Sequence, residues 1–250
     1  WVAYAAHLNS VFRAIFVADA ETGEAHQLTD GLADAMYPVW DAGGKLLWFL
    51  ASTDFGLRSQ WLDMTSFDHE ENFGLYLAVL KQGEPSPLLP ESDEDAGVSA
   101  TSDAGAAGAS KAAGAKPTGN RPGSGKPDDA KPAASVQVRI DLEGLQSRVV
   151  SVPGVPERQY SLLKAGQAGT VFYLETAAGA LPGSGAQLQR YKLSERKAIS
   201  FASEVADYAL SADGKKLVYR LAPPGGPPGP GAPPVKPVPP GLFLVDADKT

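Results

Sequence analysis

Two distant stretches of the chain share one pattern, a tight turn followed by a short apolar run. The first covers residues 37–52 (YPVWDAGGKLLWFLAS) and the second residues 207–219 (DYALSADGKKLVY). Asp can hydrogen-bond the backbone ahead of it in such a turn, and Gly adopts positive φ at no steric cost. Residues 46–51 are apolar at every position, whereas a half-buried strand would alternate. The pattern therefore predicts a repeat whose central strand is covered on both faces.

A second hairpin, with a polar turn, alternates with the first. It is predicted at residues 13–29, 75–89, 136–152 and 188–201, and it begins again at 242–246. Its second strands are expected at 26–29, 86–89, 148–152 and 198–201. One hairpin of each kind gives four antiparallel strands, which is one blade of a β-propeller. The fold class predicted is all-β, a β-propeller fragment with about three to four blades.

The blades are expected to differ in completeness. Two show the full pattern, at about 37–92 and 206–250, and a partial blade begins the chain. A degenerate one lies between the two full blades, around residues 170–174. The chain starts without Met and inside a predicted strand, so we expect it to be a fragment and draw nothing from the lack of a signal peptide.

Low-complexity segments interrupt this pattern. Residues 1–92 are predicted as blades with an inserted loop at 53–73, and residues 135–250 as further blades with a Pro-rich loop at 221–240. Residues 93–134 lack the apolar content that offsets ordering entropy, so we expect disorder there. The Pro-rich loop is expected to be an extended, polyproline-like spacer. A peptide ligand for an aromatic-lined binding domain is the alternative.

Composition excludes several classes of function. A hydrophobic content of 43% over 250 residues can bury a sizeable core. The net charge of -7 argues against nucleic acid as a partner, because no basic stripe can neutralise phosphates. Because the chain contains no cysteine, disulfides and thiol catalysis are excluded. No apolar run reaches the roughly 18 residues that cross a bilayer, so no membrane partner is predicted.

The sequence nominates no catalytic, cofactor-binding or metal-binding residue. It has no G-x-S-x-G elbow, P-loop, dinucleotide fingerprint or H-E-x-x-H motif. Of the three histidines, His7, His26 and His69, only His69 has acidic neighbours, in the segment DHEE. A solvated acidic loop explains that segment better than a metal site does. We therefore expect the chain alone to be inactive as an enzyme.

The inserted loop is the one segment with the composition of a contact surface. Residues 53–68 (TDFGLRSQWLDMTSFD) are too rich in aromatic residues for a flexible linker. One interpretation is an ordered loop facing a channel or partner, with Arg58, Trp61 and Asp63 as contact residues. The other is a loop that packs its aromatic side chains onto its own blade.

Several segments resemble known propeller proteins. The turns at 40–45 and 211–215 are similar to the W-S-P-D-G-K repeat of TolB-type, WD40-like propellers. Residues 50–68, 74–80, 85–93, 140–148 and 205–208 resemble the second propeller of tricorn-like serine peptidases of the S41 class. This resemblance implies a parent hydrolase with two propellers, a PDZ-like domain and a C-terminal catalytic core that contains the nucleophilic serine and its histidine. None of the core's motifs matches this chain, so no catalytic residue can be carried over.

The leading hypothesis is therefore a propeller segment that shapes or gates peptide access to, or exit from, a separate catalytic core during proteolysis. The partners implied are peptides and the other domains of the parent, with a homo-oligomer expected from the family. A TolB-like scaffold that binds proteins without catalysis is the alternative, and the gating propeller of a prolyl-oligopeptidase-type enzyme is a third. The sequence beyond Thr250 would discriminate among them. The resemblance implies a cytoplasmic location, with a periplasmic one left open.

Overall fold

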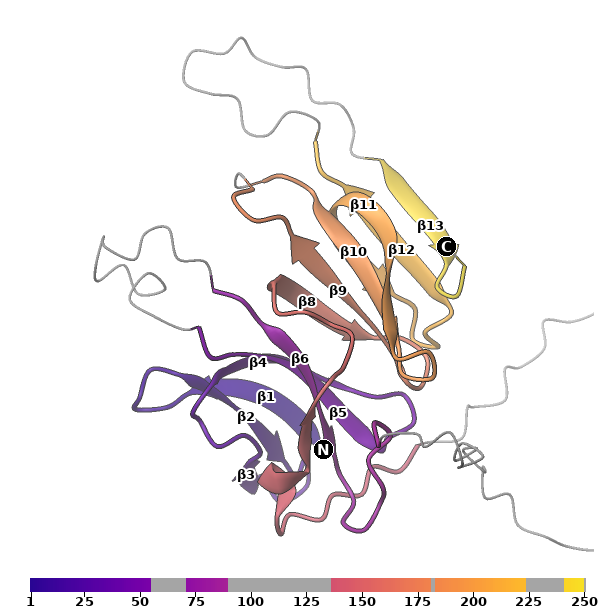
Figure 1. The fold of residues 1–250 in the computed structure, drawn as a ribbon. Helices are drawn as coiled ribbons and strands as arrows, with labels where there is room; N and C mark the ends of the chain where they lie inside the picture. The colour runs from indigo at the N-terminus through magenta and orange to yellow at the C-terminus, as the bar shows by residue number, and fades with distance from the viewer. Residues whose placement is uncertain (55–70, 90–135, 181–182, 224–240, 250) are drawn as a thin grey trace, which may run out of the picture. The chain divides into compact units, whose positions relative to one another are not determined.

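A computed structural model describes residues 1–54, 71–89, 136–180, 183–223 and 241–249 (Figure 1). These residues form antiparallel β-strands and one short 3₁₀ helix, and they contain no α-helix. The strands are β1 (Val2–His7), β2 (Arg13–Ala18), β3 (Ala25–Gln27), β4 (Asp34–Trp40), β5 (Leu46–Ser52), β6 (Gly74–Val79), β7 (Val149–Ser151), β8 (Gln159–Ala165), β9 (Thr170–Thr176), β10 (Ala186–Lys192), β11 (Lys197–Leu210), β12 (Lys216–Leu221) and β13 (Leu242–Asp246). The 3₁₀ helix is Leu145–Arg148. The predicted all-β class is confirmed.

The strands form three sheets that divide into four blades. Their orders are β1-β2-β3, β4-β5-β6-β7 and β8-β9-β10-β11-β12-β13. Strand β11 is 14 residues long, and its first part pairs with β10 while its second part pairs with β12. Between the two parts Glu204 has a φ of 58°. We call these sets blades 1 to 4. Blade 1 is β1–β3, and blade 2 is β4–β7. Blade 3 runs from β8 to the first part of β11, and blade 4 from the second part of β11 to β13.

Strand β5 is buried along its whole length, as its unbroken apolar sequence predicts. Its alternate residues sort onto two faces. Leu46, Trp48 and Leu50 belong to a cluster with blade 3, whereas Leu47, Phe49 and Ala51 belong to a cluster with blade 1. The indole of Trp48 is fully buried and meets the ring of Tyr191 edge-on at 6.1 Å. Blade 2 therefore has a neighbouring blade on each face, which confirms the prediction of a doubly covered strand.

The repeated turn has the same backbone in both copies. The N–H of Gly44 donates to Asp41 O at 2.9 Å, and the N–H of Gly214 donates to Ser211 O at 2.9 Å. Gly44 and Gly214 have φ values of 70° and 66°, where a side chain would be strained. A Cβ on Gly214 would lie 2.6 Å from the carbonyl carbon of Gly166 in blade 3. The glycine thus also permits the turns of neighbouring blades to touch.

The outer strand of blade 2 is not the one that the sequence predicts. Residues 86–89 were expected to form it, but they form a turn in which the N–H of Leu89 donates to Ser86 O. Pro87 has no N–H for a strand ladder, which explains the failure. Strand β7 fills the position by pairing with β6. Residues 136–140 were also predicted as a strand, and they are irregular.

The completeness of blades 3 and 4 also differs from expectation. Blade 3, predicted to be degenerate, has four strands, because residues 159–165 form its first strand β8. In blade 4, predicted to be complete, the described residues form three strands. The partial blade expected at the start of the chain is confirmed as the three-stranded blade 1. The predicted total of three to four blades is thus correct, although their contents were assigned differently.

Candidate functional site

The predicted contact residues Arg58, Trp61 and Asp63 lie in 55–70, outside the described residues. The structure does show both ends of that inserted loop. Asn72 Nδ2 donates to Asp54 Oδ2 at 3.3 Å, so the two ends are hydrogen-bonded to each other. Strand β5 runs from the turn at 41–45 to Ser52, where it pairs with Asp34. The loop therefore leaves blade 2 at the end opposite the repeated turn.

An ion pair joins blades 1 and 2 at this same end. The carboxylate of Asp34 is fully buried and accepts the N–H of Arg13 at 2.7 Å and its Nε at 2.9 Å. It also contacts Arg13 Nη2. The hydrogen bond with Asp34 raises the pKa of Arg13, burial opposes that rise, and Glu71 and Tyr37 add to it. Arg13 thus lies within electrostatic reach of both β4 and the end of the inserted loop.

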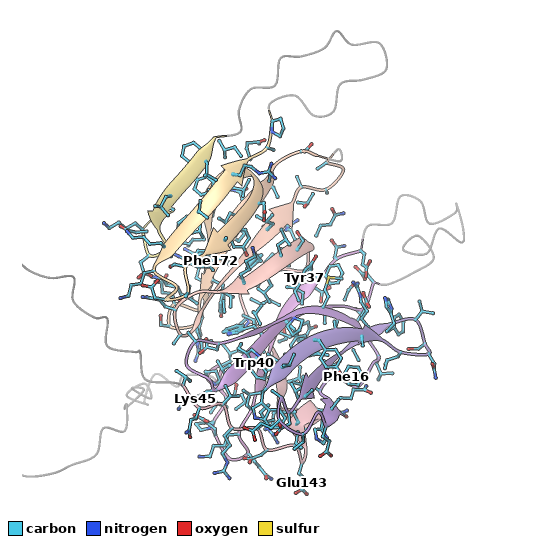
Figure 2. The ribbon with its side chains drawn as sticks, turned by 180° about the vertical axis from the view of Figure 1, so that it is seen from behind. Phe16, Tyr37, Trp40, Lys45, Glu143 and Phe172 are labelled. Carbon is cyan, nitrogen blue, oxygen red and sulfur yellow. The ribbon has the colours of Figure 1, made fainter. Side chains whose placement is uncertain are left out.

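Tyr37, three positions after Asp34 on β4, is an exposed aromatic residue (Figure 2). Its φ is 54°, and the pairing of β4 with β5 shifts register between Met36 and Val39. Leu162 of β8 has a φ of 51° at a matching register shift. Bulges of this kind re-aim a side chain, and a bulky residue at positive φ is a rare conformation held by its surroundings. Tyr37 was not among the predicted site residues, because the Tyr-Pro sequence is not typical of such a bulge.

The first strands of blades 2, 3 and 4 contact one another in order. Strand β4 contacts β8, and β8 contacts β11. Between blades 3 and 4 the hydroxyl of Tyr208 donates to Phe172 O at 2.8 Å, and the Lys164 ammonium lies 4.7 Å from the centre of the Tyr208 ring. The side of the blades that contains Tyr37 is therefore the side on which neighbouring blades meet through their first strands.

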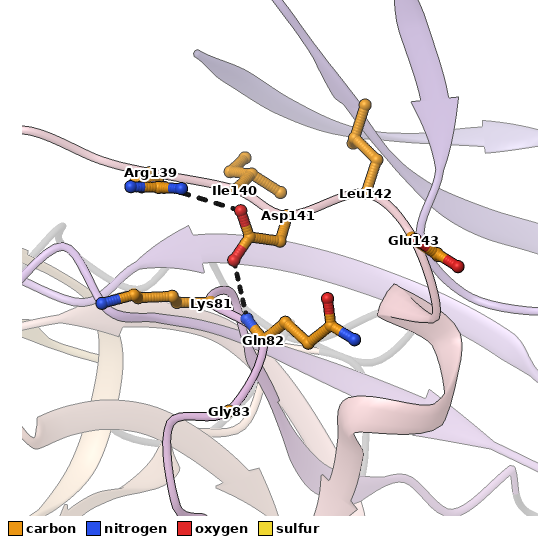
Figure 3. A pocket seen from close by; sticks show the side chains of 8 residues that line it. All are labelled: Lys81, Gln82, Gly83, Arg139, Ile140, Asp141, Leu142 and Glu143. Carbon is orange, nitrogen blue, oxygen red and sulfur yellow. Dashed lines mark hydrogen bonds and ion pairs between the residues drawn. The ribbon is translucent and has the colours of Figure 1, made fainter.

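A shallow, open depression lies beside the polar turn that follows β6 (Figure 3). Its lining combines charged side chains of both signs with apolar ones: Lys81, Gln82, Gly83, Arg139, Ile140, Asp141, Leu142 and Glu143. Asp141 accepts the N–H of Gln82 at 2.9 Å, which lowers the pKa of this carboxyl, and Arg139 lies 3.5 Å away. Arg148 donates to Val79 O at 2.9 Å and to Glu143 O at 2.7 Å, and so fixes one wall.

The described residues contain no group of three or more His, Asp or Glu side chains that could hold a metal ion. Of the histidines, His7 Nδ1 lies 2.8 Å from Val11 O, and His26 lies 3.5 Å from the carboxylate of Glu24. His69 falls outside the described part of the chain. In that part, no helix is long and apolar enough to span a membrane. The candidate site is therefore the end of blade 2 at which Asp54 and Asn72 are hydrogen-bonded and Arg13 pairs with Asp34.

Comparison with known proteins identifies the fold and nothing finer. No family model matches the sequence, and no curated protein matches it. Among solved structures, the tricorn protease matches 88% of this chain with a TM-score of 0.52 at 18% identity. TolB from Acinetobacter baumannii matches 90% with a TM-score of 0.46 at 15% identity. The β-propeller domain of the Trilobed protease from Pyrococcus furiosus matches 99% with a TM-score of 0.43 at 8% identity.

The matched regions are parts of longer proteins. This chain spans 19% of the tricorn protease chain, 35% of the TolB chain and 50% of the Trilobed protease chain. The four antiparallel blades and the similarity to the tricorn protease agree on the architecture. The chain has the fold of a tricorn-like β-propeller fragment.

Proposed function

We propose that this chain is a propeller segment of a tricorn-like serine peptidase of the S41 class. In this proposal it shapes the route by which peptides reach, or leave, a separate catalytic core. Selection is steric, because a passage lined by packed blades admits an extended chain and excludes a folded protein. The partners proposed are peptide substrates and the remaining domains of the parent enzyme.

The observation that supports the proposal best is the anchored base of the inserted loop. The Asp54–Asn72 hydrogen bond joins the two ends of the loop at one end of blade 2, where the partly buried Arg13 pairs with the buried Asp34. Tyr37, exposed on β4, lies on the side where the first strands of successive blades meet. A rigid base of this kind suits a loop that guides a substrate, since sites on packed elements are positioned more accurately than sites on free loops.

The test compares long and short peptide substrates in the parent enzyme. Trp61→Ala in the inserted loop and Tyr37→Ala at its base are expected to lower kcat/KM for long peptides. Short peptides need no guidance, so their cleavage should not change. Lys215→Ala, at an exposed residue in the repeated turn of blade 4, is the matched control and should affect neither substrate.

Two results would overturn the proposal. If cleavage of long and short substrates falls equally, these residues stabilise the enzyme as a whole, since guidance acts on long chains only. If cleavage of both substrates is unchanged, the loop does not lie on the route that the peptides take. A protein-binding scaffold without catalysis is the alternative function, and a parent that lacks a PDZ-like domain and an S41 core would favour it.

A further inference from the structure

In blade 2, one row of residues faces blade 3 and is apolar throughout. Val39 pairs with Trp48, and Trp48 pairs with Leu77, so the three side chains lie on one face of the sheet across its first three strands. Trp48 and Leu77 belong to the cluster that blade 2 forms with Tyr160 and Tyr173 of blade 3, and Val39 packs against that cluster. Along this row the interface between blades 2 and 3 therefore consists of apolar packing.

Blade 3 carries two cations in the equivalent row. One repeated bond aligns the two blades, since the N–H of Leu193 donates to Gly169 O as the N–H of Leu80 donates to Lys45 O. Counted from these bonds, and by the pairing of its strands, the row of blade 3 is Lys164, Phe172 and Arg190. The central phenylalanine, labelled in Figure 2, belongs to a cluster with blade 4, so this row faces the interface between blades 3 and 4.

The guanidinium of Arg190 is buried at this interface with little to compensate its charge. The residue is 4% exposed, and its Nη1 donates to the O of Ala247, just after β13, at 2.8 Å. Its Nε has no hydrogen-bond partner among the described residues, and the guanidinium carbon lies 5.7 Å from the ring centre of Phe201. No carboxylate in the described part of the chain pairs with it. A guanidinium has five N–H donors, so one carbonyl and one ring leave the buried charge poorly compensated.

The ammonium of Lys164 is compensated in the same way. It donates to Tyr208 O of blade 4 and lies 4.7 Å from the centre of the Tyr208 ring, and none of the described carboxylates pairs with it. Two positive charges thus occupy the positions that Val39 and Leu77 have in blade 2. Removing a cation from water costs free energy that a carbonyl and an aromatic ring offset only in part.

We propose that the interface between blades 3 and 4 is where the propeller opens, and that Lys164 and Arg190 set how readily it does so. Opening returns both cations to water, whereas separating blades 2 and 3 would expose an apolar row. The closed state is held by the Tyr208 hydroxyl, which donates to Phe172 O at 2.8 Å, and by the apolar cluster around it. Because the two effects oppose each other, this interface separates in a local opening while blades 2 and 3 stay packed.

Thiol labelling of the 250-residue chain measures the opening, because the chain has no cysteine of its own. Val171 and Leu217 are matched reporters, since both are 0% exposed and each lies on the second strand of its blade. Val171→Cys reports on the interface between blades 2 and 3, and Leu217→Cys on that between blades 3 and 4. Leu217→Cys should react faster than Val171→Cys. Arg190→Leu should slow the reaction of Leu217→Cys by about 5-fold or more, as expected when a packed apolar side chain replaces a buried charge. The reaction of Val171→Cys should not change.

The control is Lys197→Leu, which removes a positive charge from an exposed position of blade 3. It should alter neither labelling rate. Lys164→Val, which restores the residue of blade 2, should slow Leu217→Cys as Arg190→Leu does. It also serves if circular dichroism shows that Arg190→Leu does not fold.

Three results would overturn the inference. The first is labelling of Leu217→Cys that is no faster than that of Val171→Cys, and the second is labelling of Leu217→Cys that neither substitution slows. The third is equal slowing at both cysteines, which would mean general stabilisation of the chain. The effect of each substitution is measured within one cysteine variant, so any effect of the exposed outer face of blade 4 is common to both rates and cancels. The inference does not depend on the proposed peptide route, so either can fail alone.

Discussion

Removal of the Asp41 carboxylate is a direct test of how the repeated turn holds neighbouring blades together. Its side chain is buried and accepts three hydrogen bonds. Oδ2 accepts the N–H of Gly43 at 2.8 Å. Oδ1 accepts the N–H of Gly169 in blade 3 at 2.7 Å and the indole N–H of Trp48 at 3.3 Å. One carboxylate therefore joins its own turn, the central strand and the next blade.

The magnitude follows from those bonds. A hydrogen bond to a charged group contributes about 1.5–3 kcal/mol, and a buried donor left unpaired costs a similar amount. Two short bonds are lost in Asp41→Ala, so we expect its free energy of unfolding to fall by about 3–6 kcal/mol. Asp41→Asn keeps one acceptor oxygen, which can serve Gly169 and Trp48, and should lose about half as much. Unfolding in urea, followed by tryptophan fluorescence, measures both changes.

The control is Asp213, which lies in the second copy of the turn at the position of Gly43. It accepts the hydroxyl of Ser211 at 2.6 Å and the N–H of Lys215 at 3.1 Å, but it is exposed. Asp213→Ala should leave the midpoint of unfolding nearly unchanged. The reasoning is refuted if Asp41→Ala unfolds at the same urea concentration as the unmodified chain, or if Asp213→Ala is equally destabilising.

Four further predictions follow from the fold and the sequence. Trp48→Ala should lower the free energy of unfolding by about 3–5 kcal/mol in the same assay, because the indole is fully buried; a loss below 1 kcal/mol would contradict its place in the core. Deletion of residues 97–131 should leave the melting temperature almost unchanged, since each halving of loop length alters the free energy of loop closure by only about 0.6 kcal/mol. A large fall in melting temperature would mean that the segment packs on the blades. Burial raises the pKa values of Tyr160, Tyr173 and Tyr208 above the usual 10, so the folded state holds these protons more tightly than the unfolded state. Stability should then be intact below about pH 10 and fall as pH rises above it, and an alkaline titration by circular dichroism that shows no such fall would contradict this. The purified chain should give only background cleavage of fluorogenic peptides, and serine-dependent turnover that survives repurification would refute that expectation.

The sequence was informative where one physical cause dominated. The unbroken apolar run of β5 specified burial on both faces, and the Asp/Gly turns specified the hairpins. It predicted a strand at 148–152, where β7 lies, but not its pairing with β6, because local pattern cannot identify a partner from beyond residues 90–135. It also missed the bulge at Tyr37, where packing of the surrounding blades overrides local preference. The predicted contact residues in 55–70 stay a prediction.

The separation between β6 and β7 affects how the chain emerges from the ribosome. Val79 ends β6 and Val149 begins β7, so 149 − 79 = 70 residue steps separate them. At about 5–20 residues per second, the edge of β6 awaits its partner for roughly 4–14 seconds of synthesis. An apolar strand edge left open that long invites pairing with other nascent chains. Residues 93–134, which are made within this interval, contain no aromatic residue, Leu or Ile. A tract so poor in strand-forming residues cannot compete with β7 for that edge.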